Sequence, residues 1–273
     1  MKYCLKYNQL SQFLNQADEI AIKYMEDKGL VSFLEKFSSK RIILLIDEKI
    51  FSMNEVRKLI AIRQQYPEYD FTVSLLYYSK DIISLLRPNN IPFYISEPCC
   101  NWETLNLYVD AGVSDVVIGG ELGFMLRDLH QYIEKLDRRV YVRAIVNKST
   151  NQFKETNPLK GFYIRPEDID KYEGFIDVVE FYNSTMQDLF YSIYHDDKIF
   201  LGSLNQIIYG VFEDIDNKSI LPSFADRRLH CGRGCLKGRH CRFCDIVLKT
   251  ANKIEPYIEQ QIKTNIQQAS SEN

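Results

Sequence analysis

The chain has 273 residues, a formal net charge of −3 and a pI near 5.9, so it has no overall attraction to nucleic acids or membranes. Hydrophobic residues make up 45% and charged residues 26%, which is typical of a globular protein with one large domain or two small ones. The sequence shows no signal peptide and no run approaching the roughly 20 apolar residues of a membrane span, so we expect a cytoplasmic protein with reduced thiols and no membrane partner.

The first 38 residues are predicted to form a helical extension ahead of the main domain. Their apolar residues recur at the spacing of one helix face: Leu10, Phe13, Leu14, Ala17, Ile20, Ala21 and Tyr24. A second short helix is expected after Gly29, where the sequence reads LVSFLEKF. We therefore assign residues 1–38 to an N-terminal helical extension.

Residues 39–213 alternate between apolar runs typical of buried parallel strands and stretches typical of helices. Strands are expected at residues 41–47, 71–78, 91–96, 114–120, 138–146, 160–168, 175–183 and 198–206. This alternation predicts an α/β fold, and its eight units fit a TIM-like (β/α)8 barrel. The alternative is an open doubly wound sheet, but the first turn, IDEKIFSMNE, lacks the glycine-rich phosphate-binding fingerprint of that fold.

Polar residues lie in or just after several expected strands, at the end where barrel enzymes carry their chemistry. Glu97, Glu121 and Glu180 are candidate acids, bases or metal ligands, and Arg143 and Arg165 are candidate binders of an anionic group. The alternative is that these charges form structural Arg–Glu pairs between neighbouring strands, because an interior charge is costly unless it is paired.

Three cysteines lie outside the C-terminal cluster. Cys99 and Cys100 follow Pro98 where a helix is expected to begin, so each is either a nucleophile or ligand with a lowered pKa or a small residue in a tight turn. Cys4 is expected to be an inert, half-buried thiol.

The run NWETLNLYVDAGVSDVVIGGELGFMLRDL, residues 101–129, resembles the signature of the collagenase-like peptidase family, peptidase family U-thirty-two. The matching residues are Asn101, Glu103, Leu105, Ala111, Gly112, Asp115, Val116, Ile118, Gly119, Gly120, Phe124 and Arg127. The resemblance implies a TIM-like barrel. The family includes presumed peptidases, RNA base hydroxylases and accessory proteins of quinone hydroxylation, and several members hold an iron–sulfur cluster on four cysteines.

Residues 214–273 are predicted to form a cysteine-rich appendage followed by a C-terminal helix. Its pattern is Cys231-x3-Cys235-x5-Cys241-x2-Cys244. Four thiolates this close together predict one metal site, and tetrathiolate sites suit zinc or an iron–sulfur cluster. His230 and His240 lie beside the cysteines and are candidates to replace one as a zinc ligand. The choice between zinc and iron–sulfur stays open.

Basic residues are interleaved with these cysteines, namely Arg233, Lys237, Arg239 and Arg242. A local positive patch on an acidic protein suits contacts to the phosphates of RNA or DNA. The patch is equally explained by compensation of an anionic metal–thiolate centre. A third reading is that the segment is a structural clamp that pins the C-terminal helix to the barrel.

The leading hypothesis is a metal- or iron–sulfur-containing barrel enzyme that modifies RNA or a related anionic substrate, with a hydroxylase-type activity. The alternative is a non-catalytic, zinc-stabilised barrel that binds nucleic acid or a protein partner through its basic tail. A peptidase is the third hypothesis, and it rests on the family resemblance alone.

Overall fold

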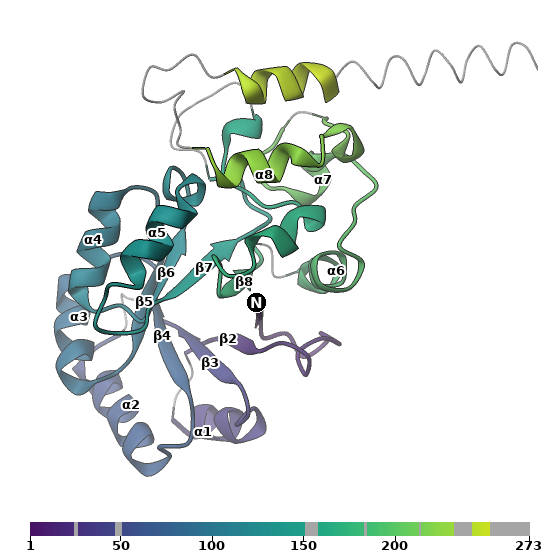
Figure 1. Cartoon of the computed structure of the whole chain (residues 1–273). Coiled ribbons are helices and arrows are strands. Elements are labelled where there is room, and N and C mark those ends of the chain that lie inside the picture. The colour runs from purple at the N-terminus through teal and green to yellow at the C-terminus, as the bar shows by residue number, and fades with distance from the viewer. Residues whose placement is uncertain are drawn as a thin grey trace, which may run out of the picture.

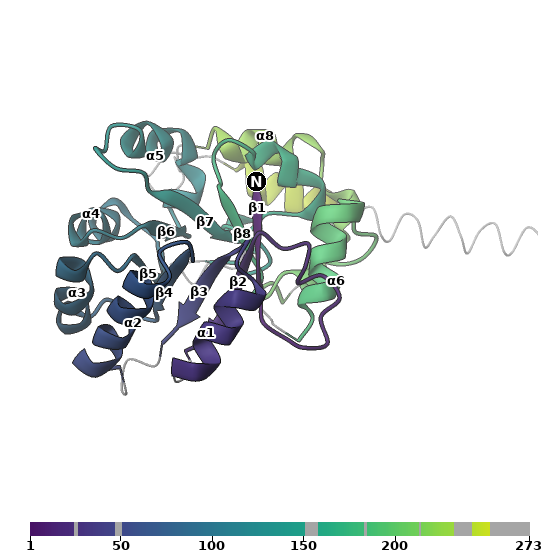
Figure 2. The ribbon, with the colours of Figure 1, turned by 90° about the horizontal axis from the view of Figure 1, so that it is seen from below.

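Eight short strands pair in parallel and close into a barrel in the computed structural model (Figure 1). The strands are β1 (Lys2–Lys6), β2 (Glu19–Lys23), β3 (Arg41–Leu45), β4 (Phe71–Leu75), β5 (Phe93–Cys99), β6 (Asp115–Ile118), β7 (Tyr141–Ile145) and β8 (Val178–Glu180). β1, labelled next to β8 in Figure 2, closes the ring by pairing with both β2 and β8. The structure describes residues 1–24, 27–46, 51–150, 158–182, 185–212, 214–231 and 242–251. The predicted (β/α)8 barrel is therefore confirmed.

Helices follow the strands on the outside of the barrel. They are α1 (Asp27–Lys36), α2 (Met53–Gln65), α3 (Lys80–Leu86), α4 (Trp102–Ala111), α5 (Leu126–Ile133), α6 (Gln187–Tyr191), α7 (Leu204–Ile207), α8 (Ser223–Leu229) and the helical residues 243–251. Short helical turns are η1 (Arg87–Asn89), η2 (Leu122–Phe124), η3 (Pro158–Lys160), η4 (Pro166–Tyr172), η5 (Ser192–Asp197) and η6 (Asn217–Ser219). Within the described ranges, no helix combines the length and apolar character needed to cross a bilayer.

Local sequence signals set the ends of the helices between the strands. α2 begins with a capping box in which Ser52 and Glu55 satisfy each other's backbone N–H groups. α4 begins at Asn101, whose side chain accepts a hydrogen bond from the backbone N–H of Thr104 at 2.9 Å. It ends at Gly112, whose φ of 93° lies in the left-handed region that favours glycine. The chain is thereby turned directly into β6.

The helical prediction for residues 1–38 was wrong at its start, because these residues supply the first two strands. Leu5, Ala17 and Ile20 are buried, whereas Leu10, expected on the apolar helix face, is 90% exposed. A five-residue strand that is buried on both faces shows no alternation of apolar and polar residues. Its apolar residues therefore also fit the spacing of a helix face. Barrel closure decides the conformation, since without β1 the edges of β2 and β8 would be unpaired.

The strands predicted at 160–168 and 198–206 were also wrong. The first segment holds an isolated antiparallel bridge from Thr150 to Phe162 and then η4, and the second leads into α7 through a capping box at Ser203. With β1 and β2 in the ring, eight strands are complete at Glu180. The barrel thus runs from residue 2 to residue 180, not from 39 to 213.

The barrel interior is filled in layers. The middle layer is mainly apolar and includes Cys4, Ala21, Ile43, Tyr94, Val117 and Val178. Beneath it, at the N-terminal ends of their strands, lie the charged residues Glu19, Arg41 and Asp115. Arg143, in the middle of β7, connects this charged layer to the opposite end of the barrel.

Two leucines of the N-terminal segment, Leu5 and Leu10, give a direct test of whether it forms a strand or a helix. Leu5→Ala in β1 is expected to lower the free energy of unfolding by about 2–5 kcal/mol, because it leaves a cavity in the core. Leu10→Ala removes the same atoms from an exposed site and is expected to change it by no more than about 0.5 kcal/mol. Urea unfolding of both variants measures the difference. Equal losses, or a larger loss for Leu10→Ala, would restore the helical assignment.

Candidate functional site

A cavity of about 450 Å3 opens at the C-terminal ends of the strands. This is the end where barrels of this kind carry their active sites, because the loops that follow the strands converge there. Its polar and aromatic lining comprises Lys6, Ser74, Tyr77, Tyr94, Ser96, Glu97, Lys148, Glu180, Phe181 and Tyr182. We call this cavity the barrel mouth.

Two lysines that are far apart in the sequence, Lys6 and Lys148, line the mouth. Lys6 ends β1, and its backbone is clamped by the side chain of Gln187, which accepts from the Lys6 N–H at 2.8 Å and donates to the Lys6 carbonyl at 2.6 Å. Lys148 follows β7, and its Nζ lies 4.1 Å from the ring centroid of Tyr182. Both ammonium groups therefore add positive charge to the mouth.

Tyr77 and Tyr182 also line the mouth, and their side chains are 56% and 46% exposed. The backbone N–H of Tyr182 donates to the side-chain oxygen of Asn147 at 2.8 Å, which ties the tyrosine to the end of β7. Exposed aromatic side chains beside cations suit the stacking of a planar, negatively charged ligand.

Glu180 is a carboxylate of the mouth whose position is set by hydrogen bonds from residues inside the barrel. Its Oε1 accepts from Arg143 Nη1 at 2.6 Å and from the Tyr94 hydroxyl at 3.4 Å. Burial raises the pKa of Tyr94 well above its ordinary value, so this hydroxyl stays protonated and can donate. The side chain of Glu180 keeps 19% of its surface exposed, so one of its faces remains open to a ligand.

Arg143 itself does not line the mouth. Its guanidinium is fully buried, stacks on Tyr94 at 4.6 Å, and pairs with Glu19, with Asp115 at 2.7 Å and with Glu180. All its nitrogens are thus occupied by carboxylates. The geometry matches the structural-pair alternative, with Arg143 orienting Glu180 instead of contacting a substrate anion.

In the charged layer below the mouth, the pKa of one carboxylate is lowered and the pKa of another is raised. Asp115 accepts from Arg41 at 2.7 and 2.8 Å and from Arg143 at 2.7 Å; burial opposes its ionisation, but these guanidiniums lower its pKa. For Glu19, burial outweighs the same two guanidiniums and raises the pKa. Two arginines thus share three carboxylates, counting Glu180.

The other predicted acid and base residues are placed differently. Glu97 is exposed, lines the mouth from β5 and accepts from the Tyr108 hydroxyl at 3.4 Å. Glu121 lies in the turn after β6, where its N–H donates to the Cys100 carbonyl at 3.1 Å, and it does not line the mouth. The structure brings Glu97 and Glu180 to one cavity and leaves Glu121 outside it.

Arg165 also lies outside the mouth. It is buried, pairs with Asp168 at 2.6 Å and donates to the Asn217 carbonyl at 3.3 Å. These contacts hold the segment after β8 against η4. The position is that of a structural arginine.

The paired cysteines form part of the wall between β5 and β6. Cys99 is fully buried, and burial raises the pKa of its thiol well above the ordinary value, which fits a small packed residue and opposes a nucleophile. Cys100 is partly buried and packs against Gly120. A Cβ atom added at Gly120 would lie only 2.9 Å from the Cβ of Cys100. Cys4 is buried in the floor of the mouth, and burial likewise raises its pKa.

Four residues that line the mouth were not predicted from the sequence, namely Lys6, Lys148, Tyr77 and Tyr182. Lys6 could not be found once its strand had been assigned to a helix. Lys148 lies two residues after the strand predicted at 138–146, so its position was available from the sequence. The two tyrosines are indistinguishable from the other 16 without the tertiary structure.

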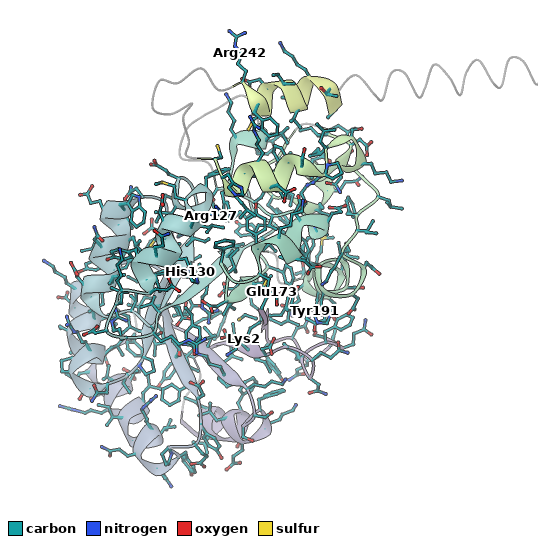
Figure 3. The ribbon with its side chains drawn as sticks, viewed as in Figure 1. Lys2, Arg127, His130, Glu173, Tyr191 and Arg242 are labelled. Carbon is teal, nitrogen blue, oxygen red and sulfur yellow. The ribbon has the colours of Figure 1, made fainter. Side chains whose placement is uncertain are left out.

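The C-terminal cysteines are described in part. Cys231 follows α8 and Cys244 lies in the helical residues 243–251; both are partly buried and pack against the core. Arg242 is exposed and points away from the barrel (Figure 3). The remaining predicted ligands and basic residues lie outside the described residues; they are Cys235, His240, Cys241, Arg233, Lys237 and Arg239. Among those that are described, no three His, Cys, Asp or Glu side chains form a metal-binding group.

No family model and no curated protein matches the chain. Among solved structures, it is similar to a 4-hydroxy-2-oxoglutarate aldolase/2-deydro-3-deoxyphosphogluconate aldolase from TTHB1, at 11% identity and a TM-score of 0.38, over 70% of this chain and 89% of that one. It is also similar to 3-hexulose-6-phosphate synthase from Salmonella typhimurium, at 15% identity and a TM-score of 0.37, over 66% and 88%. A designed cube-shaped protein cage matches at 9% identity and a TM-score of 0.40, over 98% and 84%. The barrel itself is established by the strand pairing of this chain.

The two carboxylates of the charged layer are expected to respond differently to neutralisation. At pH 7, Asp115→Asn should lower the free energy of unfolding by about 3–5 kcal/mol, because it removes a carboxylate that accepts three hydrogen bonds from the buried guanidiniums of Arg41 and Arg143. Glu19→Gln should cost at least about 2 kcal/mol less, because burial already disfavours the Glu19 carboxylate. Chemical denaturation of both variants checks the order.

Their pH dependence should have opposite signs. The folded pKa of Asp115 is lowered, so its contribution is present above the unfolded value near 3.8 and is lost as the pH falls through the folded pKa. The advantage of the wild type over Asp115→Asn should therefore shrink at acidic pH. The folded pKa of Glu19 is raised, so its contribution is present below about 4.5 and is lost as the pH rises, and Glu19→Gln should gain on the wild type towards pH 7. Parallel pH profiles would contradict this assignment.

Proposed function

We propose that this chain is a barrel enzyme that binds an RNA nucleotide, or a related anionic planar substrate, in the barrel mouth and modifies its base. One observation carries the proposal. Lys6 and Lys148 line the same cavity as the exposed Tyr77 and Tyr182. Glu180 also lines this cavity and accepts a hydrogen bond from Arg143. Ammonium groups bind phosphate oxygens, and tyrosine faces stack on any base, so this combination suits a nucleotide.

Glu180 and Glu97 are the groups available for proton transfer to or from a bound base. Arg143 donates to Glu180 at 2.6 Å and holds its carboxylate in place at the mouth, so we assign Glu180 as the general base or hydrogen-bond acceptor. Glu97 is exposed on β5 and is assigned to the partner role of acid or ligand. The cavity supports the peptidase hypothesis less well, because none of its described lining residues is a histidine that could activate a serine or cysteine.

The resemblance to peptidase family U-thirty-two and the cysteine spacing support a metal centre on Cys231, Cys235, Cys241 and Cys244. The two described ligands fit such a centre, because they come from adjoining segments: Phe243, next to Cys244, stacks on Phe224 of α8 with ring centroids 6.0 Å apart, and Cys231 directly follows α8. An iron–sulfur cluster would supply electron transfer for a hydroxylase-type reaction, whereas zinc would brace the appendage.

A second candidate function is binding of nucleic acid by the appendage without catalysis. Arg227 and Arg242 are both exposed, and the Arg227 guanidinium lies 5.2 Å from the Phe243 ring centroid. This arrangement favours phosphate contacts at the surface of the appendage. The two functions differ in where RNA binds, and the next experiment separates them.

Binding of a single-stranded RNA oligonucleotide, followed by fluorescence anisotropy at low salt, tests the mouth. The double variant Lys6→Ala, Lys148→Ala is expected to weaken binding at least about tenfold and to reduce the salt slope by about 1–2, since two phosphate contacts are lost. Lys135→Ala removes one charge from an exposed site just before β7, at the opposite end of the barrel, and should leave binding unchanged.

Loss of binding in Arg227→Ala, Arg242→Ala, with the mouth double variant unaffected, would favour the non-catalytic appendage. Equal effects of Lys135→Ala and Lys148→Ala would contradict a specific site in the mouth.

Metal analysis with an absorption spectrum of anaerobically purified protein tests the cysteine centre. We expect either visible thiolate-to-iron absorption or one zinc per chain, and loss of the metal in Cys231→Ser and Cys244→Ser because each removes a ligand. Cys100→Ser, a partly buried cysteine in the barrel wall, is the matched control and should keep the metal. A colourless protein with one zinc would contradict the proposed iron–sulfur cluster. A metal-free protein would contradict both the iron–sulfur and the zinc centre.

A further inference from the structure

Glu97 lies in a β-bulge near the end of β5. The register between β5 and β6 shifts between Ile95 and Cys99, so three residues of β5 lie opposite the single residue Val117 of β6. A bulge bends its strand and changes the direction of the side chains it carries. Pro98 fits this position because it has no N–H group to donate to a neighbouring strand. The bulge thereby places the exposed side chain of Glu97 at the barrel mouth.

Glu97 and Lys6 lie on opposite sides of the mouth. The ring of strands is closed, so β5 is four strands from β1 in either direction, and both residues line the cavity. In a nucleotide, the phosphate is attached to one side of the sugar and the base to the other. A nucleotide whose phosphate contacts Lys6 can therefore extend its base across the mouth towards Glu97.

The carboxylate of Glu97 is available to a ligand as a hydrogen-bond acceptor. Its Oε2 accepts from the Tyr108 hydroxyl at 3.4 Å, and burial raises the pKa of Tyr108, so this hydroxyl stays protonated and orients the carboxylate. Among the described residues, no cation pairs with Glu97, whereas Glu180 is paired with Arg143 at 2.6 Å. An ionised carboxylate can only accept hydrogen bonds. The two carboxylates of the mouth therefore differ, and the charge of Glu97 is the uncompensated one.

Open space adjoins Glu97 on more than one side. Besides the mouth, it lines a second cavity of about 360 Å3 together with Tyr78, Thr104 and Tyr108. Tyr77 and Tyr78 are consecutive, and the first lines the mouth while the second lines this side cavity. Glu97 thus lies at the boundary of two cavities, where the edge of a planar base can reach it.

The bases differ in what their edges offer to such a carboxylate. Cytosine and adenine carry an exocyclic amino group that donates to it, whereas uracil has a carbonyl oxygen at the corresponding position, which a carboxylate repels. Phosphates are the same in every nucleotide, so Lys6 and Lys148 carry no information about the base. Serine and tyrosine hydroxyls both donate and accept, so the hydroxyls of the mouth suit either kind of base.

We infer that Glu97 is a specificity-determining residue that accepts a hydrogen bond from the exocyclic amino group of the bound base, so that the mouth selects cytosine or adenine over uracil. The inference rests on the nucleotide binding proposed above. It narrows the role of Glu97 from acid or ligand to ligand and leaves proton transfer to Glu180.

The RNA pentanucleotides pentacytidylate and pentauridylate test the inference, because their bases are similar in size and differ at the edge that carries the amino group. Fluorescence anisotropy at low salt measures the affinity of each for the full chain. The wild type is expected to bind pentacytidylate about 5- to 20-fold more tightly, the discrimination that one well-placed base contact supplies.

Glu97→Gln should reduce this preference to within about twofold, because an amide accepts from cytosine and donates to uracil. This variant should also bind pentauridylate more tightly than the wild type does, a gain that a misfolded variant cannot produce. Glu103→Gln is the matched control, since it removes the same charge from an exposed position of α4 outside the lining of both cavities. It should keep the wild-type preference.

The outcomes separate this inference from the proposed function. A wild type that binds neither pentanucleotide overturns both. Equal binding of the two pentanucleotides, with binding lost in Lys6→Ala, Lys148→Ala, overturns the inference alone. A wild-type preference retained in Glu97→Gln, or an equal loss of preference in Glu103→Gln, would also overturn it.

Discussion

The charge cluster around Arg143 is the constraint on which the arrangement of the barrel depends. One guanidinium in the middle of β7 reaches Glu19 on β2, Asp115 on β6 and Glu180 on β8. Its contacts extend from the N-terminal ends of the strands to the mouth at their C-terminal ends. Because a buried charge is tolerated only with its partners in place, the cluster fixes the register of these strands relative to one another. The hydrogen bond from Arg143 also orients Glu180 at the cavity. The same interaction therefore stabilises the barrel and positions a carboxylate of the candidate site.

The mouth lies above this cluster, and its residues belong to no recognisable sequence motif. Lys6 and Glu180 come from the paired strands β1 and β8, and Lys148 comes from the loop after β7. Their proximity follows from closure of the ring, since parallel strands bring all their carboxyl ends to one face. The connection from β7 to β8 then continues from Lys148 to Gly161 and Tyr163, which contact Arg228 of α8. One loop thus joins the mouth to the cysteine-bearing appendage.

The predictions made from the sequence fail where the determinants are non-local. The segment 101–129 was assigned correctly as helix, strand and helix, because the Asn101 cap and Gly112 mark its turns in the sequence itself. Residues 2–6 and 19–23 carry no such local signal, and their apolar residues fit either period. Arg143 was recognised as an unusual interior charge, but only the structure shows that its guanidinium pairs with Glu19, Asp115 and Glu180. Neither Glu19 nor Arg41 was found, because both lie at the starts of strands, away from the expected site.

The sequence by itself determined the class of fold, Glu97 and Glu180 as polar strand ends, and the spacing of the four C-terminal cysteines. These features are written in periodicity, turn residues and residue type, all of which act over a few neighbouring positions. The tertiary structure decided which segments close the ring, which carboxylate faces the cavity, and which arginines are buried. Those outcomes depend on pairing between residues such as Glu19 and Arg143, 124 positions apart, whose energy exists only once the barrel has closed.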